Sequence, residues 1–300
     1  MAAYNFFRVH PALTNIVEAI WEADIPDAGT ARSIVLPVVS PILCFHYRAP
    51  PALCLDFRAD APTTQWIASS SFRITGMQSR AARLRASGPV GGVMVRLKPE
   101  SASRIGRSLL PDLFDEAAPV GDFFSPTEAS LLFEVLAGAK DAAARITAVQ
   151  DFLLRRLNYD EPDLLVRQAM LLLRTSPALT ARQLAVRLDV SERHLSRRFQ
   201  ATTGATPKQF SRIVRIGKVV ATARRHRGNW AEIADSCGFN DQAHMINEFH
   251  SMVGSSPELF FQTTSLGNQP PPIASAAESD FYNTFVLEVA SSGRKAKPAG

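Results

Sequence analysis

The chain has 300 residues, 46% of them hydrophobic, which is enough for two domains with buried cores and argues against wholesale disorder. No apolar run approaches the ~18 residues that span a membrane, and no signal peptide is evident, so we expect a cytoplasmic protein with no membrane partner. The net charge of +5 is unevenly placed, because residues 180–227 hold 12 Lys and Arg against 2 Asp and Glu.

The first part of the chain, to about residue 125, is predicted to be mixed and mostly β. Short runs rich in β-branched and aromatic residues, separated by Pro, Gly and Ser, are typical of strands. They are residues 34–47, interrupted by Pro37 and Pro41, and residues 53–57, 72–75 and 90–97. Residues 13–21 instead place apolar side chains at helical spacing, so we expect a short helix there.

This part also offers candidates for a small-molecule pocket, although aromatic residues in β regions belong to the core more often; they are Trp66, Phe72, His46, Tyr47 and Arg96. The cysteines Cys44, Cys54 and Cys237 are few and odd in number, as in proteins of a reducing cytosol. No Cys/His cluster has zinc spacing, and no His/Asp constellation accompanies a cysteine. We therefore expect no metal, no cofactor and no catalytic residue, and so no enzyme.

From Pro126 the pattern becomes helical, with apolar residues at intervals of three to four in residues 127–137, 142–157 and 163–174. A polar linker at 158–162 divides the chain. Residues 1–158 are predicted as a mixed, β-rich domain with a helical end, and residues 163–266 as an all-α domain, so the fold class is α+β. The tail, residues 267–300, has the composition of a disordered segment, with a short strand at 281–289 as the alternative.

Capping residues divide the all-α domain into short helices. Thr180 and Ser191 are N-cap types, and Gly204 is a C-cap type. Pro207 suits the first turn of a long helix. The helices are expected at residues 181–188, 191–203, 207–226, 230–236, 241–252 and 257–263.

Two stretches of this domain repeat each other at a spacing of 50 residues: Leu195, Phe199, Gly204, Pro207 and Phe210 recur as Met245, Phe249, Gly254, Pro257 and Phe260. A helix, a tight turn and a second helix, repeated once in a basic segment, is typical of a tandem helix-turn-helix that binds DNA. The predicted structural core of this motif is Leu184, Ala185, Leu195, Phe199, Ile233, Ala234, Phe239 and Phe249.

Side chains outside this core are the candidates for DNA contact. On the first helix, Arg193 and Arg197 lie four residues apart, and arginine can bind guanine through two hydrogen bonds. On the second helix, amide side chains suit adenine, but Asp241 and Glu248 are expected to oppose phosphate. The candidate DNA-binding residues are Arg193, Ser196, Arg197, Gln200, Gln242, Ala243, His244, Asn247, Lys208 and Arg212.

Residues 165–262 resemble the DNA-binding domain of the AraC/XylS family of bacterial transcription regulators. The resemblance rests on the helix from Ser191 to Phe199, on Ile233-Ala234, on Cys237-Gly238-Phe239 and on Gly254-x-x-Pro257. It implies that the long helix holds two recognition helices roughly 34 Å apart, about one DNA turn. It also implies promoter DNA and RNA polymerase as partners, a small-molecule effector bound by an N-terminal sensing or dimerisation domain, and a homodimer as one possible assembly.

Two other functions are compatible with the sequence. One is a DNA-binding module attached to a Cys-dependent catalytic domain, which would need an activated thiol. The other is a non-specific architectural DNA binder, which equal affinity for random and promoter DNA would indicate.

Overall fold

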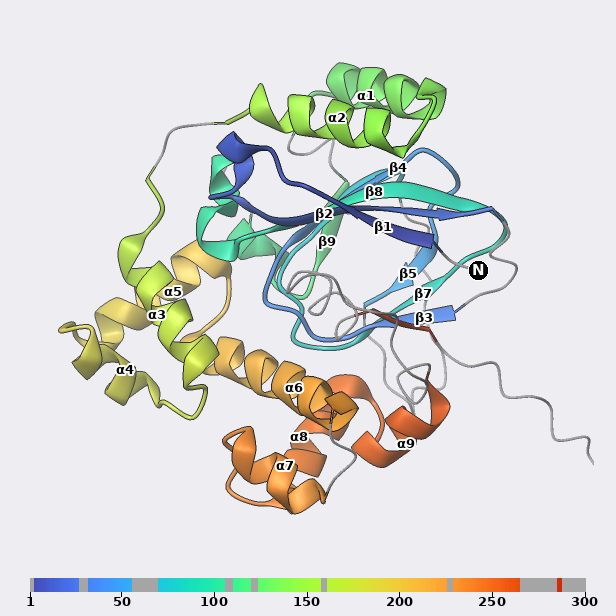
Figure 1. Ribbon diagram of the computed structural model, residues 1–300. Coiled ribbons are helices and arrows are strands. Elements are labelled where there is room, and N and C mark those ends of the chain that lie inside the picture. The colour runs from blue at the N-terminus through green and yellow to red at the C-terminus, as the bar shows by residue number, and fades with distance from the viewer. Residues whose placement is uncertain are drawn as a thin grey trace, which may run out of the picture.

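The computed structural model describes residues 3–26, 32–55, 70–105, 110–119, 124–157, 161–225, 229–264 and 285–287. Within these residues a β-rich N-terminal region precedes a helical C-terminal region, which confirms the predicted α+β fold class (Figure 1). Trp66, the end of the strand predicted at 53–57 and most of the predicted linker at 158–162 lie outside the described residues.

The described strands form two antiparallel sheets, one with the order β1-β2-β8-β4-β6-β9 and the other with the order β10-β3-β7-β5. The predicted run 34–47 is divided between β3 and β4, because its two prolines lack the N–H that a ladder needs. The bounds are β1 Ala3–Phe7, β2 Val17–Ile25, β3 Arg32–Val35, β4 Ile42–His46, β5 Ala52–Cys54, β6 Phe72–Thr75, β7 Ala82–Arg85, β8 Val90–Leu97, β9 Ala117–Pro119 and β10 Phe285–Leu287.

The helix predicted at residues 13–21 is wrong. Only Pro11–Leu13 form a short 3₁₀ helix, η1. Residues 14–16 form a turn, and strand β2, which lies between β1 and β8, begins at Val17. Ile20 and Trp21 are both buried, on opposite faces of β2 and in two different apolar clusters. A strand that is buried on both faces shows no alternation of apolar and polar residues, so its apolar run fits the helical spacing instead.

The helices predicted at 127–137 and 142–157 are observed as α1 (Pro126–Gly138) and α2 (Ala142–Leu154), which lie over the six-stranded sheet (Figure 1). Leu136 and Leu153 of these helices pack with Phe45 and Val95 of the sheet in one apolar core. Burial of this apolar surface, at roughly 25 cal/mol per Å², holds the helical layer on the sheet.

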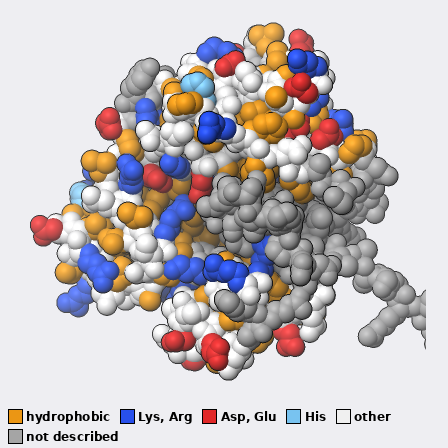
Figure 2. All heavy atoms as spheres, viewed as in Figure 1, with side chains coloured by type: hydrophobic (Ala, Val, Ile, Leu, Met, Phe, Trp, Pro, Cys, Tyr) orange, Lys and Arg blue, Asp and Glu red, His pale blue; other side chains and the backbone are white. Residues whose placement is uncertain are grey.

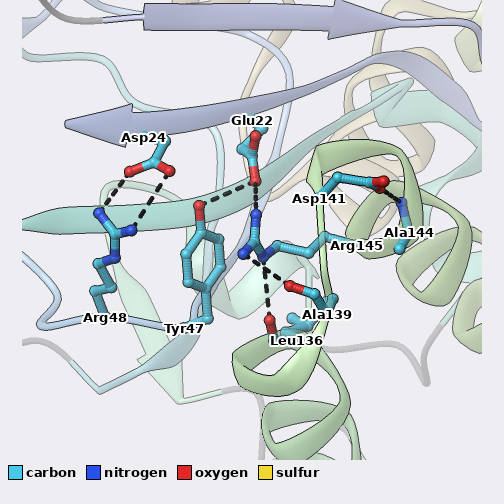
Figure 3. A network of polar contacts seen from close by, with 9 residues as sticks. All are labelled: Glu22, Asp24, Tyr47, Arg48, Leu136, Ala139, Asp141, Ala144 and Arg145. Atoms are coloured by element: carbon cyan, nitrogen blue, oxygen red, sulfur yellow. Dashed lines mark hydrogen bonds and ion pairs between the residues drawn. The ribbon is translucent and has the colours of Figure 1, made fainter. Parts of the chain in front are cut away.

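A buried carboxylate also joins these layers (Figure 3). Glu22 of β2 is 2% exposed, and its Oε1 accepts hydrogen bonds from Tyr47 Oη at 2.9 Å and from Arg145 Nη1 at 3.0 Å. Arg145 belongs to α2 and also donates to the carbonyls of Leu136 and Ala139 at the end of α1. Burial, followed by the hydrogen bond to Glu22, raises the pKa of Tyr47. The phenol therefore stays protonated and donates to the carboxylate.

The helices predicted for the C-terminal region are found within one residue of the expected ends. They are α3 Leu164–Thr175, α4 Ala181–Arg187, α5 Glu192–Thr203, α6 Pro207–Arg225, α7 Trp230–Ser236, α8 Gln242–Val253 and α9 Pro257–Thr263. In the part of the chain that the structure describes, no helix has both the length and the apolar character to cross a membrane.

The helical region packs directly against the β-rich region. Ile34 and Ala81 belong to the apolar core that α3 to α9 form. The Ala81 N–H donates to the Met252 carbonyl at 2.7 Å, and Arg174 of α3 lies 3.6 Å from Glu18 of β2. Residues of α5 also contact two short 3₁₀ helices of the β-rich region, η2 (Pro99–Arg104) and η3 (Leu110–Leu113).

A short segment of the C-terminal tail is also part of the fold. Phe285–Leu287 form β10, which pairs antiparallel with β3 at the edge of the second sheet. The disorder expected for residues 267–300 does not hold for these three residues, where the alternative of a short strand is observed. The unpaired backbone groups of an edge strand account for this pairing. The rest of the tail lies outside the described residues.

Candidate nucleic-acid interface

The two repeat units use the same local devices to define their second helices. Ser191 caps α5 by accepting from a first-turn N–H at 3.2 Å, and Asp241 caps α8 in the same way at 2.7 Å. Gly204 and Gly254 end these helices with φ of 73° and 84°, left-handed values that glycine adopts without strain. The two candidate recognition helices therefore begin and end at equivalent positions of the repeat.

The apolar cores of the two units are equivalent as well. The rings of Phe199 and Phe210 meet edge-on with centroids 5.5 Å apart, and those of Phe249 and Phe260 meet at 5.6 Å. The residues predicted as the motif core are at most 5% exposed and share one apolar cluster; they are Leu184, Ala185, Leu195, Phe199, Ile233, Ala234, Phe239 and Phe249. Each unit thus buries one face of its second helix.

The opposite face of α5 is exposed and basic. Arg193 is exposed and forms no hydrogen bond or ion pair with another described residue. Arg197 is also exposed, with its Nη2 3.4 Å from His194 Nδ1. Gln200 is exposed beside them, and Ser196 is half-buried. These arginines are free to form charge-assisted hydrogen bonds with phosphate or guanine.

Arg198, the next residue on α5, has a structural role that the sequence did not reveal. Its Nη2 lies 2.8 Å from Asp163 Oδ2, and the same aspartate caps α3 through the Val166 N–H. The ion pair joins residues 35 positions apart, so no local pattern signals it. Arg198 holds α5 against α3, and the two arginines before it are left for other partners.

The opposite face of α8 is less basic. Gln242, Ala243 and Asn247 are exposed, as predicted for side chains that read base edges. His244 is only half-buried, with its ring edge-on to Phe239 at 5.4 Å between centroids. The second helix therefore offers amide and small side chains where the first offers arginines.

The expectation that Glu248 opposes phosphate needs correction, whereas the same expectation for the exposed Asp241 stays a prediction. The Asp241 carboxylate is engaged as the cap of α8, and Glu248 is buried, with an exposed side-chain fraction of 8%. Arg215 of α6 donates to both Glu248 oxygens at 3.0 and 3.2 Å. Arg212 Nε and His244 Nε2, both predicted to contact DNA, lie 3.6 and 3.4 Å from the same carboxylate. The charge of Glu248 is thus matched inside the protein.

Helix α6 connects the two units and adds cations to the surface. Its 19 residues make it about 28 Å long at 1.5 Å per residue, somewhat shorter than one DNA turn of roughly 34 Å. Lys208, in its first turn, is exposed. In Figure 2, Lys and Arg side chains gather over the part of the molecule where Figure 1 shows α3, α4, α5 and α6.

The pocket candidates of the β-rich region that the structure describes are buried. Phe72 meets Phe45 edge-on at 5.1 Å within the core, and Tyr47 belongs to the network around the β2 carboxylate. Arg96 is 3% exposed, with its guanidinium 5.6 Å from the centre of the Trp21 ring. By these contacts Phe72, Tyr47 and Arg96 are parts of the protein core.

His46 and Cys44, on neighbouring parts of β4, are buried next to Arg73. Burial, with the charge of Arg73 as the second cause, lowers the pKa of His46 to about 3. Burial raises the pKa of the Cys44 thiol, and it does the same for Cys237 in the helical region. Neither thiol is activated for nucleophilic attack. Over the described ranges, no three His, Cys, Asp or Glu side chains gather as a metal site would require.

Comparison with known proteins finds a family model that matches most of the helical region. Residues 184–263 match the family model of a helix-turn-helix domain. The structure of ToxT from Vibrio cholerae is similar at 11% identity over 81% of this chain and 97% of that chain, with a TM-score of 0.44. Its complex with an unsaturated fatty acid matches at 12% identity over 81% and 94%, also at 0.44.

The C-terminal domain of AraT, a response regulator from Geobacillus stearothermophilus, matches at 20% identity over 38% of this chain and 93% of that chain, with a TM-score of 0.34. No curated protein sequence matches the chain significantly.

Proposed function

We propose that the protein is a sequence-specific transcription regulator whose C-terminal helix-turn-helix domain, of the AraC type, reads two successive major grooves of promoter DNA. One observation carries this proposal: the same capped helix occurs twice, each time with one face buried and the other exposed. The domain points to a regulator rather than an enzyme.

In this proposal the two helices divide the work of recognition. Arg193 and Arg197 of α5 bind guanine edges or phosphates, and Lys208 at the start of α6 binds phosphate. Gln242 and Asn247 of α8 read adenine. The exposed Ala243 and Gln200 and the half-buried Ser196 and His244 fill the rest of the two contact surfaces.

We further propose residues 1–158 as the domain that senses a small-molecule effector and residues 163–266 as the DNA-binding domain. The contact between α5 and the β-rich region supports this coupling. Gly204, which ends α5, packs so closely on η3 that an added Cβ would lie 2.1 Å from the Pro111 carbonyl oxygen. A ligand that shifts η3 would therefore move the end of α5. RNA polymerase and a second copy of the chain are the further proposed partners, and the cytoplasm is the proposed location.

Selection of bound duplexes from fragmented genomic DNA of the host, with the full chain at ~150 mM salt, tests the proposal. We expect enrichment of sites that carry two short motifs about 10 base pairs apart, because the two helices meet the same face of the duplex one turn apart. Uniform binding to all fragments, weakening steeply with salt, would instead indicate the architectural binder.

A further inference from the structure

Glu248 occupies an unusual place for a carboxylate, because it lies on a candidate recognition helix and faces the helix that joins the two units. Arg215 is its main partner, at 3.0 and 3.2 Å, and is also held by the Gly238 carbonyl at 3.4 Å and by the Phe239 ring at 4.7 Å from its centroid. Arg215 therefore has three separate anchors and stays in place if one is weakened.

Arg212 is held far less firmly. Its Nε lies 3.6 Å from Glu248 Oε1, its side chain is 37% exposed, and Glu248 is its one charged partner among the residues that the structure describes. His244 is placed similarly. Its side chain is 37% exposed, and its Nε2 lies 3.4 Å from Glu248 Oε2. One buried carboxylate thus holds two half-buried basic side chains against the protein.

The first unit treats the equivalent position in the opposite way. Arg198 stands 50 residues before Glu248 and forms its ion pair with Asp163, which leaves Arg193 and Arg197 free. At this position of the repeat, the first unit has a cation, Arg198, that pairs within the fold. The second unit has an anion, Glu248, that also engages Arg212. The second arrangement engages Arg212, which is one of the predicted DNA contacts.

We propose that Glu248 is a positioning residue that limits sequence-independent DNA binding by the second unit. It ties α8 to α6 and keeps Arg212 from the phosphate backbone, so that α8 contributes base contacts with little generic attraction. The proposal rests on the proposed DNA-binding function. In this proposal Arg212, which the sequence predicts as a DNA contact, is kept from the DNA by its ion pair with Glu248.

Glu248→Gln in the full chain tests the proposal, because glutamine keeps the shape and an acceptor for Arg215 but loses the charge that holds Arg212. The binding of a shuffled duplex and of a duplex from the genomic selection is measured by fluorescence anisotropy over a range of salt concentrations. For the shuffled duplex we expect roughly threefold to tenfold tighter binding and a slope of log K against log salt steeper by about 0.9, as for one added phosphate contact. For the selected duplex we expect a smaller gain in affinity, because α8 is less firmly fixed to α6 in the variant.

Glu258→Gln is the matched control, since Glu258 is exposed on α9 and its replacement changes the charge of the same domain without breaking an ion pair to any described residue. Adding Arg212→Ala to Glu248→Gln should return the affinity for the shuffled duplex to the wild-type value. The proposal is overturned if Glu248→Gln changes binding no more than Glu258→Gln, or if the added Arg212→Ala leaves the gain intact. A wild-type chain with no preference for the selected duplex contradicts the proposed function, and this proposal with it.

Discussion

The two regions of the molecule use charged side chains in opposite ways. In the β-rich region Glu22 and Arg96 are both at most 3% exposed and lie within or between packed layers. In the helical region Arg193 and Arg197 are exposed on a helix whose other face is buried. Buried charges are costly unless they are paired, whereas exposed ones contribute little to folding and remain available to a ligand. Substitutions in the first region should therefore change stability, and those in the second should change DNA binding.

The largest effect on stability is expected at the ion pair between Glu22 of β2 and Arg145 of α2. Arg145→Ala leaves the Glu22 carboxylate buried with Tyr47 as its remaining donor, and we expect a loss of about 3–5 kcal/mol in the free energy of unfolding. Urea denaturation of the full chain measures it. Combining Glu22→Gln with Arg145→Met removes both charges and should recover much of that loss. A loss below about 1 kcal/mol for Arg145→Ala would mean that this buried arginine behaves like a surface one.

A second effect concerns pH and His46. The pKa of this buried histidine is about 3 in the folded protein, below its ordinary value of about 6.5 in the unfolded chain. The unfolded chain therefore binds the proton first, so the contribution of His46 is fully present above about pH 6.5 and declines as the pH falls toward 3. Between pH 6.5 and pH 4.5 we expect a loss of roughly 2–3 kcal/mol in unfolding free energy.

His46→Gln, which retains a donor for the Ser71 carbonyl, should flatten this part of the pH dependence. Denaturation curves of wild type and variant at several pH values make the comparison. An identical decline in both proteins would assign the acid sensitivity to other groups.

Arg197→Ala, in contrast, should change DNA binding and leave stability almost unchanged. We expect its affinity for a selected duplex to fall by ~1–3 kcal/mol, with relaxed preference at the contacted base pair, while unfolding free energy changes by about 0.5 kcal/mol or less. Binding titrations against duplexes that vary one base pair at a time provide the measurement. Unchanged affinity and selectivity would remove the proposed base-reading role of Arg197.

The same contrast explains which parts of the structure the sequence predicts. The helical region follows local rules: Thr180 and Ser191 cap helices by hydrogen bonds to residues three positions away, and Gly204 ends one, so their patterns are visible in the chain. The repeat adds a second copy of each signal. The exposed candidates on α5 and α8 follow from the same helical periodicity.

The β-rich region depends instead on distant partners. Strand β2 is stabilised by β1 and β8, and its buried Glu22 pairs with a residue 123 positions away, so its apolar run was ambiguous in isolation. The error at Glu248 and the undetected ion pair of Arg198 have the same origin, because their partners are 33 and 35 positions distant. Where pairing is non-local, the residue type alone does not tell an exposed charge from an engaged one.

Arg198 offers the smallest and most discriminating test, since it lies beside Arg197 on the same helix but pairs with Asp163. The ion pair is partly exposed, with Arg198 at 48%, so Arg198→Ala should cost about 0.2–1 kcal/mol of unfolding free energy. Asp163→Asn retains an oxygen to cap α3 and should cost no more. DNA affinity should fall far less in Arg198→Ala than in Arg197→Ala, measured on the same duplexes. Equal losses would show that Arg198 leaves its aspartate to bind DNA, and that the division between structural and DNA-binding arginines fails on α5 itself.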